Sequence, residues 1–388
     1  MTSHDSDVLI IGAGAAGHSA ATTLRRDGFD GTVRVVHDEP VAPYNRTLVD
    51  KGILPGLLTP VQAALPSLAS LGVEIVSGKA SAIDPAERLV RLADATELPF
   101  RSLLLAVGST PRPVLRNGEV EGVFPLHRAV DAQQIRSHVG SDFAGRVVTV
   151  LGAGLVGTEA ASVFTASGAR VHLVARSEVP LVSALGTPVA TRLRDLHREH
   201  TIFHGGRTVT ALRRTARGIE VHLDDAQVWE SDLVVTAQGT TPATAWVPSG
   251  SAGVTVDASL RVEGLPHVYA AGGAVLHPSP GGGRIRIDHW DDAVAQGAHA
   301  ARALLHDVTH GNDPGHYRPI SGYSVNIYGS SLNGVGTARP GTSAHTVPTD
   351  DGGLVTTFTD SDALMTGAVG WRASRVVHQI RQELALRP

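Results

Sequence analysis

Two copies of the pattern Gly-x-Gly-x-x-Gly, at 12–17 and at 152–157, are the residues of this chain with the clearest chemical meaning. Each follows an apolar run, Val8–Ile11 or Val147–Leu151, and precedes a helix-forming, alanine-containing stretch. Between a strand and a helix, the first glycine allows a tight turn, the second lets backbone approach a pyrophosphate, and the third lets the helix pack on the strand. The phosphates then lie against unpaired N–H groups at the positive end of the helix dipole. Two such turns predict two dinucleotides, which is typical of a flavoprotein reductase carrying FAD and a nicotinamide cofactor.

Two acids follow the second expected strand of the first unit. Asp38 and Glu39 come after the run Val33–Val36, at about 20 residues beyond the glycine pattern, where an acid commonly holds the ribose hydroxyls of an adenosine. The alternative is that they are the solvated end of a strand.

The corresponding place in the second unit has a different character. After Val171–Val174 the sequence reads Ala175-Arg176-Ser177-Glu178, so the acid is missing at the strand end and an arginine follows. A guanidinium can pair bidentately with a 2′-phosphate. The sequence therefore favours NADPH. NADH stays possible if Arg176 is only an exposed loop residue and Glu178 turns inward.

Cysteine is absent from the 388 residues, and its absence excludes several kinds of chemistry. A redox-active disulfide needs two thiols, and neither a cysteine-ligated iron–sulfur cluster nor a cysteine nucleophile can be built. Any flavin in this chain must therefore pass its electrons out directly.

The composition points to an ordinary globular protein. Hydrophobic residues make up 42% and charged residues 18% of the chain, and the formal net charge is −4, which gives no reason to expect nucleic acid or an anionic membrane as a partner. No apolar run reaches the ~18 residues of a transmembrane helix, and the polar N-terminus does not look like a signal peptide. We expect a cytoplasmic protein. His197 and His200 lie at helical spacing without a third ligand, so no metal site is predicted.

Alternation of strand and helix signals predicts an α/β fold with two Rossmann-like three-layer dinucleotide-binding domains, one inserted in the other, and a small α+β C-terminal domain. Strands are expected at Val73–Val76, Leu89–Leu92 and Leu103–Val107, and a long helix at about 291–305. Glycine-to-proline turns at 108–111 and 239–242 suggest the boundaries. The predicted domains are an FAD-binding domain at 1–112 and 240–312, an NAD(P)H-binding domain at 113–239, and a C-terminal domain at 313–388.

The chain resembles the FAD-dependent ferredoxin reductases of oxygenase systems, within the pyridine nucleotide-disulfide oxidoreductase superfamily. The resemblance covers roughly residues 7–305, and residues 316–388 only loosely. It is carried by Pro43-Tyr44-Asn45-Arg46 through Lys51, by Gly157-Thr158-Glu159, by Leu105 to Arg112, and by Asp288-His289-Trp290 with Gln296-Gly297. The last stretch is the most specific, since it has no generic structural reason to recur.

The resemblance implies roles for several of these residues. Arg46 would contact FAD, and Lys51 would lie beside the flavin ring and favour its reduced form. Glu159 would pair with Lys51 near the path of the nicotinamide. Trp290 would lie against the isoalloxazine, and the crossing from Ala106 to Arg112 would touch the flavin nucleotide.

The chain also departs from the family pattern. The family's A-x-G-D, whose aspartate binds the ribityl chain of FAD, reads Ala271-Gly272-Gly273-Ala274 here, and the C-terminal aromatic segment reads Gly322 to Asn326. Losing that carboxylate should remove charge-assisted hydrogen bonds, each worth about 1.5–3 kcal/mol. We therefore expect weak or altered FAD binding, and tighter binding on restoring aspartate by Gly273→Asp.

The function expected from the sequence is transfer of electrons from NADPH, through FAD, to a small iron–sulfur protein, by a monomer or homodimer. Two alternatives stay open: a flavin-dependent reductase or oxidase of a small molecule in a biosynthetic pathway, and a non-catalytic nucleotide-binding relative. The candidate catalytic residues are Lys51, Glu159 and Trp290. The candidate cofactor-binding residues are Gly12, Gly14, Ala15, Ala16, Gly17, Asp38, Glu39, Arg46, Lys51, Ala106, Gly108, Arg112, Gly152, Gly154, Leu155, Val156, Gly157, Glu159, Arg176, Gly239, Gly272, Gly273, His289 and Trp290.

Overall fold

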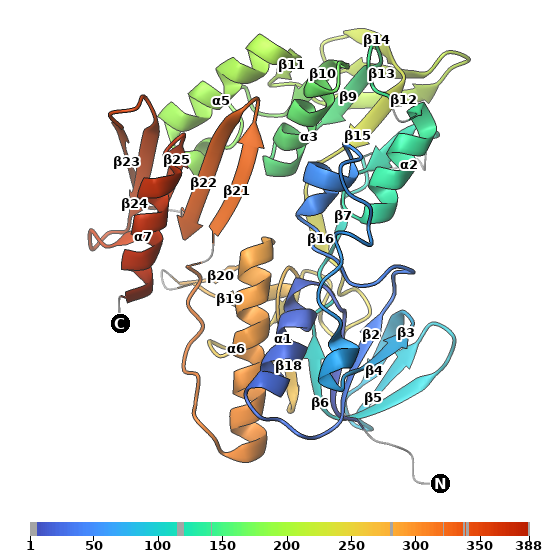
Figure 1. Cartoon of the computed structure of the whole chain (residues 1–388), viewed down its shortest axis with the longest axis vertical. Helices are drawn as coiled ribbons and strands as arrows, with labels where there is room; N and C mark the ends of the chain where they lie inside the picture. The colour runs from blue at the N-terminus through green and yellow to red at the C-terminus, as the bar shows by residue number, and fades with distance from the viewer. Residues whose placement is uncertain are drawn as a thin grey trace. The chain divides into compact units, whose positions relative to one another are not determined.

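A computed structural model describes residues 6–114, 120–140, 142–279, 282–320, 322–336, 338 and 341–386. Its chain forms two compact units, each assembled from separate segments (Figure 1). Unit 1 comprises Met1–Arg46, Pro60–Thr110 and Thr240–Arg318, and unit 2 comprises Thr47–Thr59, Pro111–Gly239 and Pro319–Pro388.

Unit 1 is built on a seven-stranded sheet in the order β3-β2-β1-β6-β5-β4, with β18 also paired to β6. The parallel strands are continuous apolar runs because both faces of the sheet are covered; Leu9 and Ile10, for example, are fully buried. The strands are β1 (Ser6–Ile11), β2 (Val33–His37), β3 (Glu74–Ser77), β4 (Ala80–Asp84), β5 (Leu89–Leu92), β6 (Glu97–Leu105) and β18 (Val268–Ala270).

Strand β6 differs from the sequence expectation of 103–107 by starting at Glu97 and ending at Leu105. Its first residues, Glu97–Pro99, pair antiparallel with β5, whereas Phe100–Leu105 pair parallel with β1. Leu103–Leu105 also pair parallel with β18, so this one strand takes part in three ladders. The apolar run predicts only its buried second half, because the first half alternates between exposed and buried residues.

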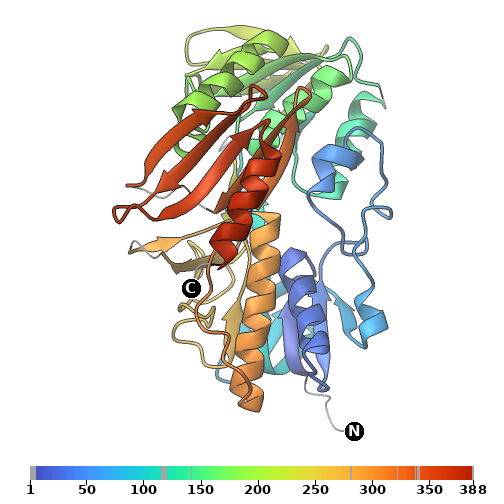
Figure 2. The ribbon, with the colours of Figure 1, turned by 60° about the vertical axis from the view of Figure 1, so that its left-hand side comes forward.

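Two helices of unit 1 lie side by side in both ribbon views, α1 (Ala15–Arg26) and α6 (Trp290–Thr309) (Figures 1 and 2). Gly297 makes their close approach possible, because a Cβ there would lie 2.8 Å from the carbonyl carbon of Ala16. The hydroxyl of Ser19 on α1 donates to the carbonyl oxygen of Val294 on α6. These contacts fix the start of α6 beside the first glycine turn.

Unit 2 repeats the parallel arrangement with a five-stranded sheet in the order β11-β10-β9-β15-β8, and adds the antiparallel sheet β12-β13-β14. Helix α3 (Leu155–Ala166) follows β9 as α1 follows β1. The other elements are β8 (Val123–Pro125), α2 (Ala129–Val139), β9 (Val147–Leu151), β10 (Arg170–Ala175), α4 (Val182–Leu185), α5 (Thr187–His200), β11 (Ile202–Gly205), β12 (Val209–Arg214), β13 (Ile219–Leu223), β14 (Val228–Ser231) and β15 (Leu233–Thr236).

The C-terminal part of unit 2 is a five-stranded antiparallel sheet in the order β21-β22-β25-β24-β23. Alternate residues bury its two faces: Leu332, Phe358 and Trp371 pack with α5, whereas Val335 and Val355 pack with α7. The elements are β21 (Gly322–Ile327), β22 (Ser330–Gly336), β23 (Ser343–Pro348), β24 (Leu354–Thr359), β25 (Met365–Trp371) and α7 (Ser374–Leu386).

The remaining elements are short, and the sequence did not predict them. They are a π-helix at Val49–Ile53, a 3-10 helix at Leu68–Leu71, β7 (Ser109–Pro111), β16 (Thr240–Pro242), β17 (Val254–Thr255), β19 (Val275–Pro278) and β20 (Arg284–Ile285). The α/β fold class expected from the sequence is confirmed.

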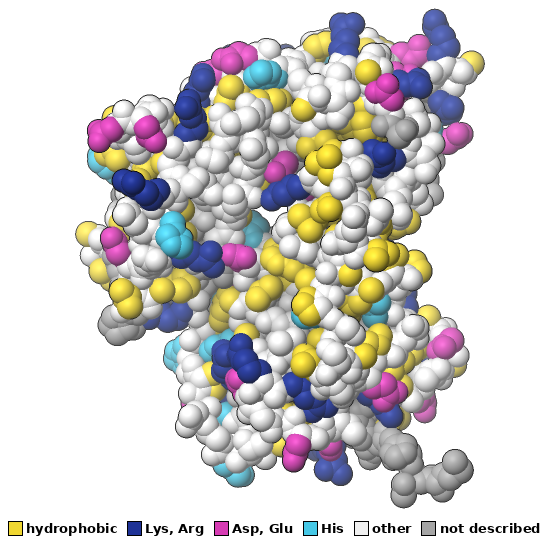
Figure 3. Space-filling model, in the orientation of Figure 1, with side chains coloured by type: hydrophobic (Ala, Val, Ile, Leu, Met, Phe, Trp, Pro, Cys, Tyr) yellow, Lys and Arg dark blue, Asp and Glu magenta, His cyan; other side chains and the backbone are white. Residues whose placement is uncertain are grey.

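The surface is of mixed charge. On the face drawn in Figure 3, basic and acidic side chains are interspersed, as the near balance of 33 Lys and Arg with 37 Asp and Glu would give. None of the helices in the described ranges combines the length and the apolar character needed to span a bilayer.

Candidate functional site

In the first glycine turn, neighbouring backbone atoms occupy the space that side chains at Gly12 and Gly17 would need. Gly12 has φ +103°, and a Cβ there would lie 2.9 Å from the carbonyl carbon of Ala106. A Cβ on Gly17 would collide with the carbonyl oxygen of Gly12, so α1 packs directly on the turn. Gly14, the N-cap of α1, has only open space around its missing side chain and makes no side-chain cap. The first N–H groups of α1, including those near Ala15 and Ala16, are therefore available to an anion.

The second turn has the same geometry. Gly152 has φ +106°, and its added Cβ would lie 2.9 Å from the carbonyl carbon of Ala237. A Cβ on Gly157 would collide with the carbonyl oxygen of Gly152, and Gly154 is again an uncapped N-cap with open space. Leu155 and Val156 open α3 at this point. Both turns thus offer donor-lined space without side chains, which fits the diphosphates of FAD and of NAD(P)H.

The two acids after β2 have different surroundings. Asp38 is exposed directly after the strand. Glu39 is only 6% exposed in its side chain, and its carboxylate accepts hydrogen bonds from the Tyr44 hydroxyl and from Arg46 Nη2, each at 2.8 Å. The structure therefore brings the sequence-predicted Glu39 and Arg46 together and leaves Asp38 at the surface.

The end of β10 presents a basic residue. Ala175 is buried as the last residue of the strand, whereas Arg176 is exposed, with no ion pair to any described residue. Glu178 points elsewhere, because its carboxylate accepts a hydrogen bond from Arg198 at 2.6 Å. The position directly after β10, where an acid could bind the 2′-hydroxyl of an adenosine ribose, is therefore occupied by Arg176 rather than by Asp or Glu.

Lys51 and Glu159 meet inside unit 2. Lys51 lies in the π-helix, and Glu159 lies near the start of α3, two residues after Gly157. Lys51 Nζ is 3.7 Å from Glu159 Oε2. It also donates to the carbonyl oxygen of Ser324 at 2.8 Å, and the amide of Asn326 donates to Glu159 at 3.2 Å. Strand β21, in the segment that departs from the family, thus supplies backbone partners to both charged groups, directly beside the second glycine turn.

Asp50 is a third member of this cluster that the sequence analysis missed. Its side chain is buried, and its carboxyl group interacts with that of Glu159. Burial raises the pKa of Asp50, with Lys51 opposing the rise. Burial, and then the neighbouring Asp50 carboxylate, raise the pKa of Glu159 to about 8, again against the effect of Lys51. A carboxyl group whose pKa is raised to about 8 is protonated near neutral pH, so Glu159 holds a proton beside Asp50 and Lys51.

His289 and Trp290, two of the predicted site residues, lie at the start of α6, and Gly272, a third, is hydrogen-bonded to this helix. His289 is the N-cap of α6 and Trp290 its half-buried first residue. Gly272 has φ +84°, and its amide donates to Gln296 Oε1 at 2.8 Å. Gln296 in turn donates to Asp292, so the first turns of α6 are tied to the chain leaving β18.

The surroundings of Gly273 bear on the expectation that Gly273→Asp would tighten FAD binding. A Cβ at this position would collide with Oδ1 of Asp288 and lie 2.9 Å from its Cγ. The space that an aspartate at 273 would need is taken by another carboxylate. The single substitution should therefore disturb the site, and the sequence could not show this because the two residues are apart in the chain.

The two crossings between units are alike. Gly108 has φ +67° and Gly239 has φ +86°, each with open space where a Cβ would stand. The amide of Arg112 donates to the carbonyl oxygen of Gly239 at 3.0 Å. Ala106 is buried, and its amide donates to the carbonyl oxygen of Ile11, beside the first turn.

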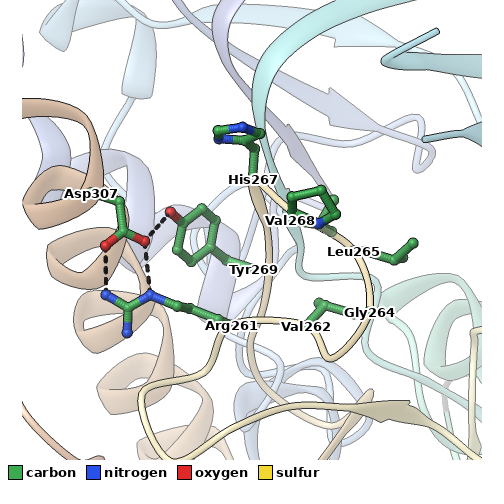
Figure 4. Close-up of a pocket in the computed structure, with 9 residues that line it drawn as sticks. Arg261, Val262, Gly264, Leu265, His267, Val268, Tyr269 and Asp307 are labelled. Carbon is green, nitrogen blue, oxygen red and sulfur yellow. Dashed lines mark hydrogen bonds and ion pairs between the residues drawn. The ribbon is translucent and has the colours of Figure 1, made fainter. Parts of the chain in front are cut away.

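A cavity of about 390 Å³ lies elsewhere on unit 1 (Figure 4). Its residues include His267 and Val268, at the amino end of β18, whereas the glycine turns follow the carboxyl ends of the parallel strands. Its polar groups satisfy one another: Arg261 forms two hydrogen bonds with Asp307, and Tyr269 a third. The hydrogen bond from Arg261 lowers the pKa of Asp307. This arrangement is a structural clamp rather than part of the dinucleotide sites.

Comparison with known proteins agrees with these features. The family model described as pyridine nucleotide-disulphide oxidoreductase matches residues 6–297. Apoptosis-inducing factor 3 of Homo sapiens is 31% identical over 317 residues, which cover 78% of this chain but 51% of that protein, so the chain spans about half its length. A ferredoxin–NAD(P)(+) reductase of a Sphingomonas species is 30% identical over 321 residues, covering 78% of this chain and 76% of the relative.

Solved structures show the same fold. The covalent putidaredoxin reductase–putidaredoxin complex is similar with a TM-score of 0.87 at 22% identity, covering 98% of this chain and 93% of that one. An engineered water-forming NADPH oxidase bound to NADPH has a TM-score of 0.83 at 20% identity, covering 96% and 89%. Its matching family model, over residues 6–297, shows that the chain belongs to the pyridine nucleotide-disulphide oxidoreductase family, and its 388 residues contain no cysteine from which a redox-active disulfide could form.

Proposed function

We propose that this protein transfers electrons from NADPH, through FAD, to a small iron–sulfur protein. The observation that carries the proposal is the pair of equivalent glycine turns, one in each unit, in a chain without cysteine. Bound FAD would supply the redox chemistry, accepting a hydride from the nicotinamide and releasing electrons to the acceptor. The Sphingomonas relative named as a ferredoxin–NAD(P)(+) reductase supports the class of acceptor.

We assign FAD to the first turn, in a domain of residues 1–112 and 240–312, and NADPH to the second, in residues 113–239, with residues 313–388 as the C-terminal domain. Asp38 would accept hydrogen bonds from the adenosine ribose of FAD, and Arg46, held by Glu39, would stand close to that cofactor. Exposure of Asp38 and burial of Glu39 support this division of roles.

The preference for NADPH is supported by the tripeptide after β10. The engineered NADPH oxidase carries three consecutive substitutions, aspartate to alanine, alanine to arginine and methionine to serine, relative to an NADH oxidase of Lactobacillus brevis. These substitutions create the sequence Ala-Arg-Ser, which this chain has naturally at 175–177. Because Arg176 has no ion pair to a described residue, its guanidinium can receive a 2′-phosphate.

Lys51, Glu159 and Trp290 would position the reacting rings. Lys51 is oriented by the carbonyl oxygen of Ser324 and by Glu159, so its charge is fixed in direction. Such a fixed cation would stabilise negative charge on a reduced cofactor beside it. Trp290, at the first position of α6, would limit the space at the flavin edge and exclude water.

A second candidate is favoured by the carboxyl pair of Asp50 and Glu159. A proton held near neutral pH beside Lys51 suits a reaction that delivers a proton together with two electrons, such as reduction of a small molecule. An iron–sulfur acceptor takes electrons without a proton, so the proton that arrived with the hydride would have to leave the site, and the pair would not be needed to deliver one.

Anaerobic titration of the purified holoprotein with NADPH and with NADH tests the proposal. Bleaching of the flavin absorbance by NADPH, at lower concentration than by NADH, is expected, followed by rapid reduction of cytochrome c only when a ferredoxin is added. Efficient turnover with a small-molecule acceptor and none with ferredoxin would instead support the second candidate. A bound flavin that neither nucleotide bleaches would contradict both.

A further inference from the structure

Asp288 has one carboxylate oxygen fully engaged and one left open. Its Oδ2 accepts hydrogen bonds from Ser109 Oγ at 2.8 Å, from Thr240 Oγ1 at 2.5 Å and from Arg286 Nη2 at 2.7 Å. Its Oδ1 receives no hydrogen bond from the residues that the structure describes, and the side chain is 33% exposed. Three donors fix the carboxylate in place, and the second oxygen is presented as a rigid acceptor.

Gly273 lies next to this acceptor oxygen and leaves room for it. Its φ is outside the left-handed region, so backbone conformation does not demand glycine there. The demand comes from contact, because an added Cβ would collide with Asp288 Oδ1. Arg286 ties the two together, since its Nε donates to the carbonyl oxygen of Gly273 while Nη2 donates to Asp288. The absent side chain at 273 and the carboxylate at 288 are one arrangement.

This arrangement stands at the same edge of the sheet as the first glycine turn. Gly272 and Gly273 follow the carboxyl end of β18, which pairs parallel with β6, as β6 does with β1 before Gly12. A Cβ on Gly272 would lie 3.1 Å from the Cβ of Ala16, in the first turn of α1. A ligand whose phosphates lie at this turn would extend past this edge.

We propose that Asp288 is a flavin-binding residue, which accepts hydrogen bonds through Oδ1 from hydroxyl groups of the ribityl chain of FAD. This rests on the proposed function, in which the first turn binds FAD. A polyol offers several hydroxyl donors, and a fixed, charged acceptor binds them more strongly than a neutral one. Asp288 would thus provide the carboxylate that position 273 lacks, because its Oδ1 lies in the space beside Gly273.

The test is titration of the apoprotein with FAD, followed by flavin fluorescence, for the wild type and three variants. Asp288→Asn keeps the shape but turns the open acceptor into an amide, and should weaken FAD binding about 10-fold, the loss expected for one charge-assisted hydrogen bond. Gly273→Asp should also weaken it, because two carboxylates then compete for one space. The double variant Gly273→Asp with Asp288→Gly should recover most of the affinity.

Binding of ADP is the matched control, since ADP contains the phosphates and ribose but no ribityl chain, and Asp288→Asn should leave it unchanged. Wild-type affinity for FAD in Asp288→Asn, or a double variant no better than Gly273→Asp alone, would overturn the inference. Equal weakening of ADP and FAD would also overturn it, because the effect would not be on the ribityl chain. Failure of the wild type to bind FAD at all would instead refute the proposed function.

Discussion

The two glycine turns are alike in backbone and differ in what surrounds them. Gly12 and Gly152 have φ values of +103° and +106°, and in each turn a Cβ on the third glycine would collide with the carbonyl oxygen of the first. Two residues beyond the third glycine, however, the first helix carries Ser19 and the second carries Glu159. Ser19 donates to a backbone carbonyl of α6, whereas Glu159 meets Lys51 and Asp50. The shared backbone of the two turns suits the diphosphate that FAD and NAD(P)H have in common. The charged residues around Glu159, which the first turn lacks, suit the chemistry at the second site alone.

The ends of the second strands differ in the same way. Asp38 follows β2 and presents an acid, whereas Arg176 follows β10 and presents a base. Ribose hydroxyls donate to a carboxylate, and a 2′-phosphate accepts from a guanidinium. The same turn geometry can therefore bind two different nucleotides when the exposed residue after the second strand is negatively charged in one unit and positively charged in the other.

The largest expected effect comes from filling each turn. Gly14→Val and Gly154→Val place a side chain in open space at φ −69° and −75°, so neither should disturb the fold. Each should exclude a diphosphate, with at least about 100-fold loss of affinity if two charge-assisted hydrogen bonds are lost. We expect Gly14→Val to be purified without flavin, and Gly154→Val to keep flavin but to resist bleaching by NADPH. The reverse pattern, seen by absorbance, would exchange the two assignments.

A smaller effect is expected from exchanging the strand ends. Ala175→Asp combined with Arg176→Ala should reduce kcat/KM for NADPH by about 10–100-fold, since a bidentate pair is lost and a repulsive carboxylate is gained. The value for NADH should rise. Steady-state rates with both nucleotides measure the change, and Arg217→Ala, which removes an exposed arginine paired with Glu230, is the control. An unchanged ratio of the two rates would mean that Arg176 does not face the 2′-position.

Sequence reasoning identified these turns because their glycines act over a few neighbouring residues. The same holds for β1, β2, β9 and β10, whose apolar runs are buried on both faces. It missed Asp50, since nothing local shows that this carboxyl group will be buried against Glu159. It could not foresee the surroundings of Gly273 for a similar reason, because the atom that fills the space beside it belongs to Asp288. Contacts between residues far apart in the chain decided both cases.

The carboxyl pair gives a pH dependence that the first turn should lack. The pKa of Glu159 is raised from 4.5 to about 8 in the folded protein, so its contribution to stability is fully present below pH 4.5 and is lost as the pH rises toward 8. The difference in unfolding free energy between wild type and Glu159→Gln should follow this window, as measured by urea denaturation at several pH values. Ser19→Ala, at the matching position of α1, should show no such window. A difference that stays constant from pH 4.5 to about 8 would mean that no proton is held there.

The smallest effect is expected where the two halves of the molecule are most alike, at Gly108 and Gly239. Both have positive φ and open space around the missing Cβ, so alanine meets no atom and suffers only the cost of a left-handed backbone. That cost is roughly 1–2 kcal/mol, which for units of this size lowers Tm by about 2–4 °C per kcal/mol. Gly154→Ala in the apoprotein is the control, because its φ is −75°. Similar losses for Gly108→Ala and Gly239→Ala in thermal unfolding would indicate that the crossings, like the turns, are equivalent in backbone; a much larger loss at one would show that an unlike contact, rather than the shared conformation, requires its glycine.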